Sequence, residues 1–391
     1  MSRYLWNFLG LFVSLFILTF EFDYSIIPHF YEGLNPFFEP LISFSGETFF
    51  GLENGFPPSI SSDSIGLYVH VFNLVALSML VSGAIQLTNF KTNVNLRLYT
   101  SYILIYYISL KLLIYGFDKM FKAQFFLPEP NTLFTPLKDI SKDLLYWSTM
   151  GVSRSYSIFL GVMEVLTACL LLFKKTRLLG ILIGIGVMGN VVAVNFSFNI
   201  SVKVFSLFLL GGFLVLLSPY FRFLYGLFFK QKLGDFPIQT ESFLRMNPKI
   251  KKGLKMLLIL LFFAEALNPF LRTQNFNDDN SPRPKFHGAY QVVNYNSEIK
   301  NVFVHRHGYL IFQDQKDKFQ DFQLEVDSVN QKLLLFNYRD KKRYEIAYEF
   351  DNNSLIHISG RIHNFEFDMT LLKQNWKDAQ LLQNEFNWTT E

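Results

Sequence analysis

Four ionisable side chains lie within or beside long apolar stretches, where a charge is costly and marks a paired group or a functional site. Lys111 and Lys119 belong to one stretch, Glu164 to a second and Glu265 to a third. Lys111, Tyr115 and Lys119 follow the spacing i, i+4, i+8, which places them on one stripe of a helix. Because this helix precedes the one that carries Glu164, we expect Glu164 to pair with one of the two lysines.

Further polar residues could join this pair in a buried cluster. The candidate set is Lys111, Tyr115, Lys119, Glu164, Asn190, Asn195 and Lys203. Two interpretations stay open. In one, an ion pair and interhelical amide bonds fix the helices in register, because buried charges must pair. In the other, the same groups form the polar floor of an apolar pocket, where a quinone or a lipid headgroup is hydrogen-bonded.

Several kinds of catalysis are excluded by the residues present. Cys169 is the single cysteine, so a thiol relay or a thiolate metal cage cannot form within the chain. The sequence has no phosphate-binding loop, serine-hydrolase elbow, HExxH motif or dinucleotide fingerprint. His70 is the one histidine clearly within an apolar stretch, which argues against a bis-histidine haem. No catalytic residue can be assigned, and any enzymatic role is expected to be that of a membrane oxidoreductase subunit.

The composition defines the surroundings of these residues. Of the 391 residues, 17% are charged, 50% are hydrophobic and 46 are Phe, which is typical of a polytopic membrane protein with a soluble part. A span needs about 20 mostly apolar residues. We predict seven spans, at residues 5–22, 65–88, 98–117, 155–173, 178–196, 202–218 and 254–271. The first is expected to be an anchor, because no small-residue cleavage site ends it.

Basic residues concentrate in alternate loops, and this bias predicts the orientation. The loop at residues 23–64 holds six acidic residues and no Lys or Arg, whereas residues 174–177 and 220–253 are basic. We therefore expect a bacterial inner-membrane protein with a cytoplasmic N-terminus and a periplasmic C-terminal domain. The lipid bilayer is its expected partner and nucleic acid is not.

Two of the predicted outer loops are long and rich in aromatic residues and proline. They cover residues 23–64 and 123–151. So many aromatic side chains favour burial on the bundle or at the membrane interface. Two placements stay open, because the loops could cover an outward-facing cavity or lie on the lipid headgroups.

The C-terminal part has a different pattern. Residues 275–284, rich in Asn, Asp, Ser and Pro, predict a linker. After it, apolar and polar residues alternate in seven segments, at 290–293, 309–312, 322–326, 332–336, 344–348, 355–358 and 365–369. This pattern predicts an antiparallel barrel or meander that holds a small apolar ligand or is filled by side chains. Its histidines, including His305, His307, His357 and His363, are expected to be solvated, and no metal site is predicted.

A series of short motifs runs through residues 102–219: the segments 115–119, 144–151, 161–164 and 170–173, then Lys175, Thr176, Arg177, Gly180, Asn190, Asn195, Phe196, Val202 and Lys203. This series resembles the DoxX-like family of small bacterial four-helix membrane proteins, in a larger form with extra spans and a C-terminal β domain. The resemblance implies a four-helix core. It also implies a role as a membrane subunit beside oxidoreductases, with quinone as the acceptor in some relatives.

Together these inferences predict a membrane all-α bundle of about seven spans, a four-helix DoxX-like core plus extra spans, with a C-terminal soluble antiparallel β domain. The predicted parts are spans and a long outer loop at 1–97, the core at 98–219, a cytoplasmic loop and last span at 220–274, the linker at 275–284 and the β domain at 285–391. The first hypothesis is the membrane component of a redox or envelope complex, with a pocket for a quinone or lipid. The alternative is a non-catalytic envelope protein whose β domain binds a protein partner or a small apolar ligand.

Overall fold

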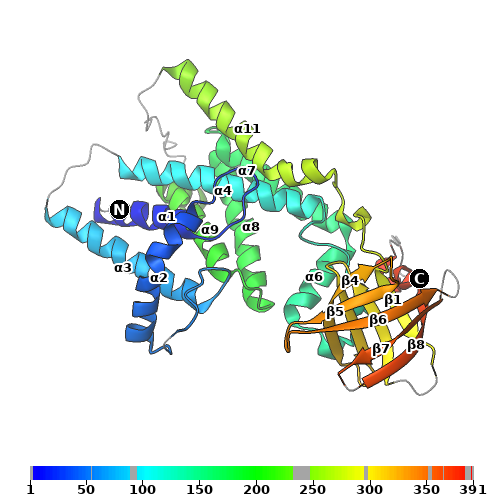
Figure 1. Ribbon diagram of the computed structural model, residues 1–391. Helices are drawn as coiled ribbons and strands as arrows, with labels where there is room; N and C mark the ends of the chain where they lie inside the picture. The colour runs from blue at the N-terminus through cyan, green and yellow to red at the C-terminus, as the bar shows by residue number, and fades with distance from the viewer. Residues whose placement is uncertain are drawn as a thin grey trace. The chain divides into compact units, whose positions relative to one another are not determined.

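The computed structural model describes residues 3–53, 55–88, 95–231, 247–294, 298–350, 355–363, 365–383 and 389. The chain forms two compact units (Figure 1). We call Met1–Gln124 with Ser155–Phe276 the helical unit, and Phe125–Arg154 with Asn277–Glu391 the barrel unit. Residues 232–246 of the predicted cytoplasmic loop between the last two spans lie outside the described residues.

The helical unit contains six segments, within the described residues, that are long and apolar enough to cross a membrane. They are Ile65–Leu87, Leu96–Met120, Arg154–Leu172, Arg177–Ser197, Lys203–Lys230 and Pro248–Asn280. The first predicted span instead forms α1 (Arg3–Thr19), an apolar helix of 17 residues. Glu21 and Asp23 follow it directly, and these acidic residues limit the apolar length available to the helix.

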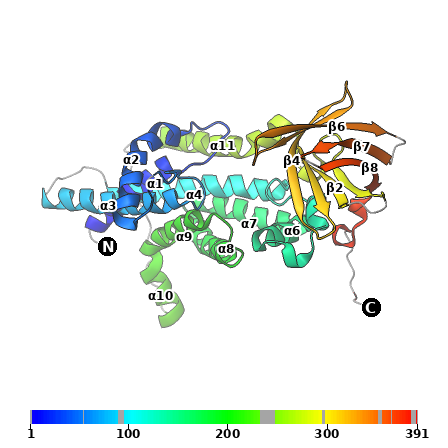
Figure 2. The same cartoon turned by 60° about the horizontal axis from the view of Figure 1, so that its bottom comes forward.

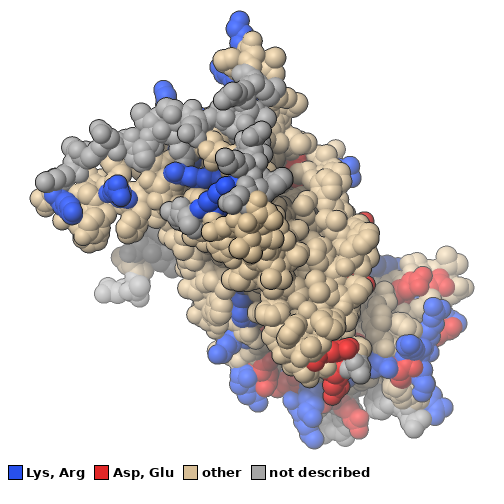
Figure 3. Space-filling view, turned by 90° about the vertical axis from the view of Figure 1, so that its left-hand side faces the viewer, with Lys and Arg blue, Asp and Glu red and all other residues tan. Residues whose placement is uncertain are grey.

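The remaining helices of this unit are α2 (Phe30–Phe50), α3 (Ile65–Leu87), α4 (Leu96–Met120), α7 (Arg154–Leu172), α8 (Arg177–Ser197), α9 (Lys203–Leu217), α10 (Phe221–Lys230) and α11 (Pro248–Thr273). Helix α4 contacts α1, α9 and α11. A three-residue 3-10 turn, Ser218–Tyr220, joins α9 to α10, which extends away from α8 and α9 (Figure 2). The face in Figure 3 carries a broad area of uncharged side chains, as a surface solvated by lipid tails would.

Helix α2 lies in the segment that we predicted to be an outer loop. Its 21 residues include Pro36 and Pro40, although proline is unfavourable inside a helix. The buried residues Asn35, Ile42 and Gly46 nevertheless recur at helical spacing along one face. A side chain at Gly46 would collide with the ring of Phe56, so the glycine permits the helix to pack on the chain that follows it.

The barrel unit contains eight antiparallel strands in sequential order, and β1 pairs with β8 to close the barrel (Figure 2). The strands are β1 (Gly288–Val292), β2 (Ile299–His305), β3 (Tyr309–Asp314), β4 (Phe319–Asp327), β5 (Lys332–Asn337), β6 (Lys342–Phe350), β7 (Leu355–Ile362) and β8 (Phe365–Gln374). The predicted antiparallel barrel is therefore confirmed, with one strand more than the seven expected. The missed strand, β2, does not alternate, because the polar residues Lys300 and Asn301 are adjacent and are followed by only three apolar residues.

The predicted linker and the second predicted outer loop are both folded parts of the barrel unit. The loop contains α5 (Pro130–Leu133), a 3-10 turn (Leu137–Asp139) and α6 (Lys142–Val152). Phe134 packs against Phe303 with 5.5 Å between ring centroids and 56° between the ring planes, and Gln313 donates a hydrogen bond to the Phe134 carbonyl. In the predicted linker, Asp278 forms ion pairs with Arg283 and Arg306. Residues 125–151 therefore belong to the barrel unit, and the ion pair of Asp278 with Arg306 joins the predicted linker to the turn between β2 and β3.

Candidate functional site

Lys119 of α4 and Glu164 of α7 form a buried ion pair. The Lys119 ammonium donates to both carboxylate oxygens, at 2.8 Å to Oε2 and 3.0 Å to Oε1. The two residues are 7% and 4% exposed, respectively. The pairing expected for Glu164 is thus present, with Lys119 as the partner. Tyr115 lies one turn earlier on α4, with its ring centroid 5.5 Å from the ammonium.

A glycine contact places the two charged residues together. Gly116 and Gly161 each lie three residues before a member of the pair, and they face each other across the α4–α7 crossing. A Cβ atom on Gly116 would lie 2.7 Å from a methyl carbon of Val165 and 2.9 Å from the Gly161 carbonyl oxygen. Only glycines allow this approach of two membrane helices.

Lys111 is fully buried but has no carboxylate or hydrogen-bond partner among the described residues. Its ammonium instead lies against aromatic rings, 2.8 Å from the ring centroid of Phe22 and 4.2 Å from that of Tyr24. Tyr107 and Phe205 complete this aromatic box, at 5.2 and 5.8 Å. Aromatic faces attract cations most strongly when water is excluded, so the rings provide part of the lost solvation.

Glu265 of α11 is the fourth ionisable residue, and hydrogen bonds from backbone N–H groups stabilise its carboxylate. Its carboxylate accepts hydrogen bonds from the backbone N–H groups of Ser25, Ile26 and Ile27, the last two at 2.8 Å. The Ser25 hydroxyl donates to the same carboxylate at 2.9 Å. The segment after α1 is therefore fixed between two buried charges.

The remaining predicted site residues lie elsewhere, so the seven do not form one cluster. Asn190 is exposed on α8. Asn195 is buried, but its amide donates to the Val202 carbonyl at 3.5 Å and links α8 to α9. The Lys203 ammonium lies 3.6 Å from Asp63, whose carboxylate also accepts the Lys203 backbone N–H at 2.8 Å. These contacts close turns at one end of the bundle and do not reach Glu164.

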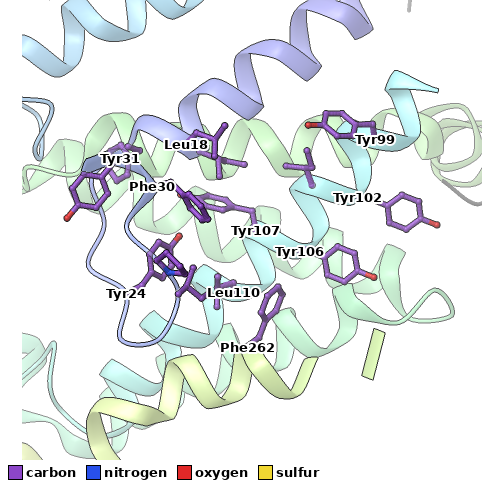
Figure 4. A pocket seen from close by; sticks show the side chains of 15 residues that line it. Leu18, Tyr24, Phe30, Tyr31, Tyr99, Tyr102, Tyr106, Tyr107, Leu110 and Phe262 are labelled. Carbon is purple, nitrogen blue, oxygen red and sulfur yellow. The ribbon is translucent and has the colours of Figure 1, made fainter. Parts of the chain in front are cut away.

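The helical unit contains a pocket of about 400 Å³ beside the aromatic box (Figure 4). Its lining is mostly aromatic and aliphatic and comes from α1, the segment after it, the first turn of α2, α4 and α11: Ile17, Leu18, Phe20, Tyr24, Ile27, Pro28, Phe30, Tyr31, Tyr99, Tyr102, Ile103, Tyr106, Tyr107, Leu110 and Phe262. Tyr24 and Tyr107 contribute to both the pocket and the box. This volume is in the range of small-molecule sites.

A second buried polar network lies in the barrel unit. Glu129 accepts hydrogen bonds from the His287 ring at 2.8 Å and from the Arg306 backbone N–H at 3.0 Å. Burial alone would raise the pKa of Glu129, but these bonds and the nearby His305 outweigh it and lower the pKa. Burial lowers the pKa of His305. Sequence reasoning missed this network, because Glu129 lies in the predicted loop and we expected the histidines to be solvated.

The described residues contain no group of three or more His, Cys, Asp and Glu side chains that could hold a metal ion. The fold defines a multi-helix membrane protein that carries a C-terminal β-barrel. No family model and no solved structure matches the chain. The chain is similar to the uncharacterized protein YwoB of Bacillus subtilis (strain 168), with 29% identity over 129 residues that cover 33% of this chain and 82% of that protein.

Proposed function

We propose that the protein is a DoxX-like membrane component of a redox or envelope complex, and that the pocket between α1, α4 and α11 binds a quinone or a lipid molecule. The observation that carries the proposal is the aromatic pocket of about 400 Å³ in the helical unit. Its tyrosines offer hydroxyl groups within an otherwise apolar lining, which suits a flat ring or an acyl chain with one polar end. A bound quinone would supply electron-accepting chemistry, and the residues of the chain would bind and orient it.

We place this pocket away from most of the predicted site residues. Lys111 contacts its lining through Tyr24 and Tyr107. Lys119 and Glu164 contact each other and act as a clamp between α4 and α7, the structural alternative of the two interpretations. We assign the ligand to the aromatic lining and the ion pair to helix register.

We also propose that the protein lies in a bacterial inner membrane with the N-terminus in the cytoplasm and the barrel unit in the periplasm. Contacts at the two ends of the helical unit support the assignment of its loops to opposite sides of the membrane. At the expected inner end, Arg177 and Lys255 donate to the last carbonyls of α7, at 3.1 and 2.7 Å. At the other end, Asp63 pairs with Lys203. Helix α1 runs antiparallel to α3, since Tyr4 donates to Met79 at one end and Thr19 contacts His70 at the other. The orientation needs an odd number of crossings, so in this proposal the shorter helix α1 crosses as well as the six longer segments.

The test is to purify the full chain in lipid nanodiscs and to identify extracted molecules by mass spectrometry. Ile103→Trp fills the pocket, whereas Leu182→Trp, on the exposed face of α8, adds the same ring outside it. We expect a quinone or lipid enriched above the surrounding bilayer in the wild type and in Leu182→Trp, and a loss of it in Ile103→Trp. A wild-type protein without enrichment, or equal enrichment in both variants, would refute the proposal.

A non-catalytic envelope protein that anchors the β-barrel remains the alternative function. It differs in one measurable respect, because it needs no ligand in the helical unit. If Ile103→Trp removes the bound ligand and cells that carry this variant keep the phenotype of the wild type, the alternative holds and the redox role fails.

A further inference from the structure

The barrel unit has one filled end and one open end. At the filled end, Phe286 packs on Tyr348 with 5.2 Å between ring centroids, and the Tyr290 hydroxyl donates to the Phe286 carbonyl. The space left there is about 20 Å³. At the other end a cavity of about 570 Å³ remains, lined by Glu298, Ile299, Phe312, Asp314, Gln320, Ile362, His363, Phe367 and Met369. The barrel is therefore closed by side chains at one end and open at the other, and a barrel of this size can hold a single small ligand.

The strand pattern explains why the open end of the barrel, which we call the barrel mouth, is amphipathic. Inward-facing residues alternate along each strand, as Leu310 and Phe312 do on β3. Asp314 is the next residue of that inward row, and Gln320 begins the inward row of β4 that continues with Phe322. The interior thus changes from apolar to polar within one step of each row. A ligand would place an apolar body on the floor and a polar head at the rim.

The charges at the rim select the head group. The lining contains two carboxylates, Glu298 and Asp314, and no Lys or Arg among the described residues. The backbone N–H groups of Lys316 and Lys318 both donate to Oδ1 of Asp314, which leaves its Oδ2 available for a ligand. These hydrogen bonds, together with the nearby charges of Lys318 and Lys316, lower the pKa of Asp314 and favour its anionic form.

We propose that the barrel mouth binds a small amphipathic molecule with an apolar body and a cationic, ammonium-type head. The apolar body contacts Phe312, Phe367 and Met369, and the head contacts Asp314 and Glu298. This site is separate from the pocket in the helical unit and does not depend on the function proposed for it.

The experiment uses the full chain in phosphatidylcholine nanodiscs with methyl-labelled methionine. Met369 on the cavity floor reports binding by its methyl resonance, and Met188 in α8 is the control, since both are 3% exposed. The probes are n-octylammonium, n-octanol and n-octanoate, which share a chain and differ in head charge. We expect a saturable shift at Met369 and none at Met188, with the tightest binding for the ammonium and the weakest for the carboxylate.

Two matched variants test the head group. Asp314→Asn keeps the oxygen that accepts the two backbone N–H groups and removes the charge, so it should weaken octylammonium binding about threefold and leave octanol unchanged. Asp321→Asn removes a charge between the inward-facing Gln320 and Phe322, on the opposite face of the strand, and should change neither. Ile362→Trp fills the mouth and should abolish binding of all probes. No saturable shift at Met369, or octanoate binding as tight as octylammonium, would overturn the proposal.

Discussion

The ion pair between Lys119 and Glu164 allows a quantitative test of the helical unit. Glu164→Gln removes the carboxylate that accepts two hydrogen bonds from an ammonium only 7% exposed. Water cannot replace the lost partner at this depth, so the change should cost about 3–5 kcal/mol in the free energy of unfolding. Lys119→Met should cost a similar amount, because it leaves the carboxylate buried without its cation.

The double variant Lys119→Met/Glu164→Gln should recover most of that loss, since neither charge is left alone. The assay is reversible unfolding of the purified protein in mixed detergent micelles, with the free energy measured for the wild type, both single variants and the double variant. Asn190→Leu, at an exposed position of α8, is the control and should change stability by less than about 0.5 kcal/mol. If the losses of the single variants simply add in the double variant, the pair does not stabilise the fold and the reasoning is wrong.

Three further predictions concern other buried features. Gly161→Ala places a methyl group against backbone of α4 and should cost about 1–3 kcal/mol in the same assay, whereas Gly186→Ala, which faces open space, should not. Lys111→Met should leave stability unchanged or raise it by about 1–4 kcal/mol, because that ammonium has no hydrogen-bond partner among the described residues; a clear loss would show that the aromatic box binds the charge with a net gain. The pKa of His305 is lowered from its ordinary 6.5 and that of Glu129 from 4.5, so the unfolded chain binds more protons as the pH falls. The melting temperature of the barrel unit, followed by circular dichroism, should therefore fall as the pH drops through 6.5 and again below 4.5, and Glu129→Gln should make the lower step smaller.

The sequence predicted the elements whose hydrophobic pattern is determined by the solvent around them, either lipid or water. Membrane helices must present a long apolar stretch to lipid, so six of the seven expected spans have the length and composition to cross. Barrel strands alternate between core and water, so period two identified seven of the eight. The failures, α2 and β2, lack a simple solvent pattern. Each is held by tertiary contacts, such as Gly46 of α2 against Phe56, that no local rule describes.

The sequence predicted one buried charge correctly for a similar reason. A carboxylate in a span requires a cation or hydrogen-bond donors, and Lys119 lies on the preceding predicted span, within reach of Glu164. Nothing comparable marks the partners of Glu265, because every residue has a backbone N–H group and the three that bind it have apolar or small side chains. The network of Glu129 with His287 and Arg306 joins residues 158 and 177 positions apart, and no spacing rule covers such distances.

The aromatic box explains why the predicted polar pocket and the observed pocket differ. Our prediction assumed that Lys111 would find carboxylate or amide partners and so lie on a polar floor with Glu164. In the structure, the lysine lies among rings, and two of them, Tyr24 and Tyr107, also line the pocket. A chain with 46 Phe residues gives no sequence signal for which rings surround a given cation. The pocket therefore has an aromatic wall with a buried charge behind it, and Tyr24 reaches that wall because Glu265 fixes the backbone of Ser25 directly after it.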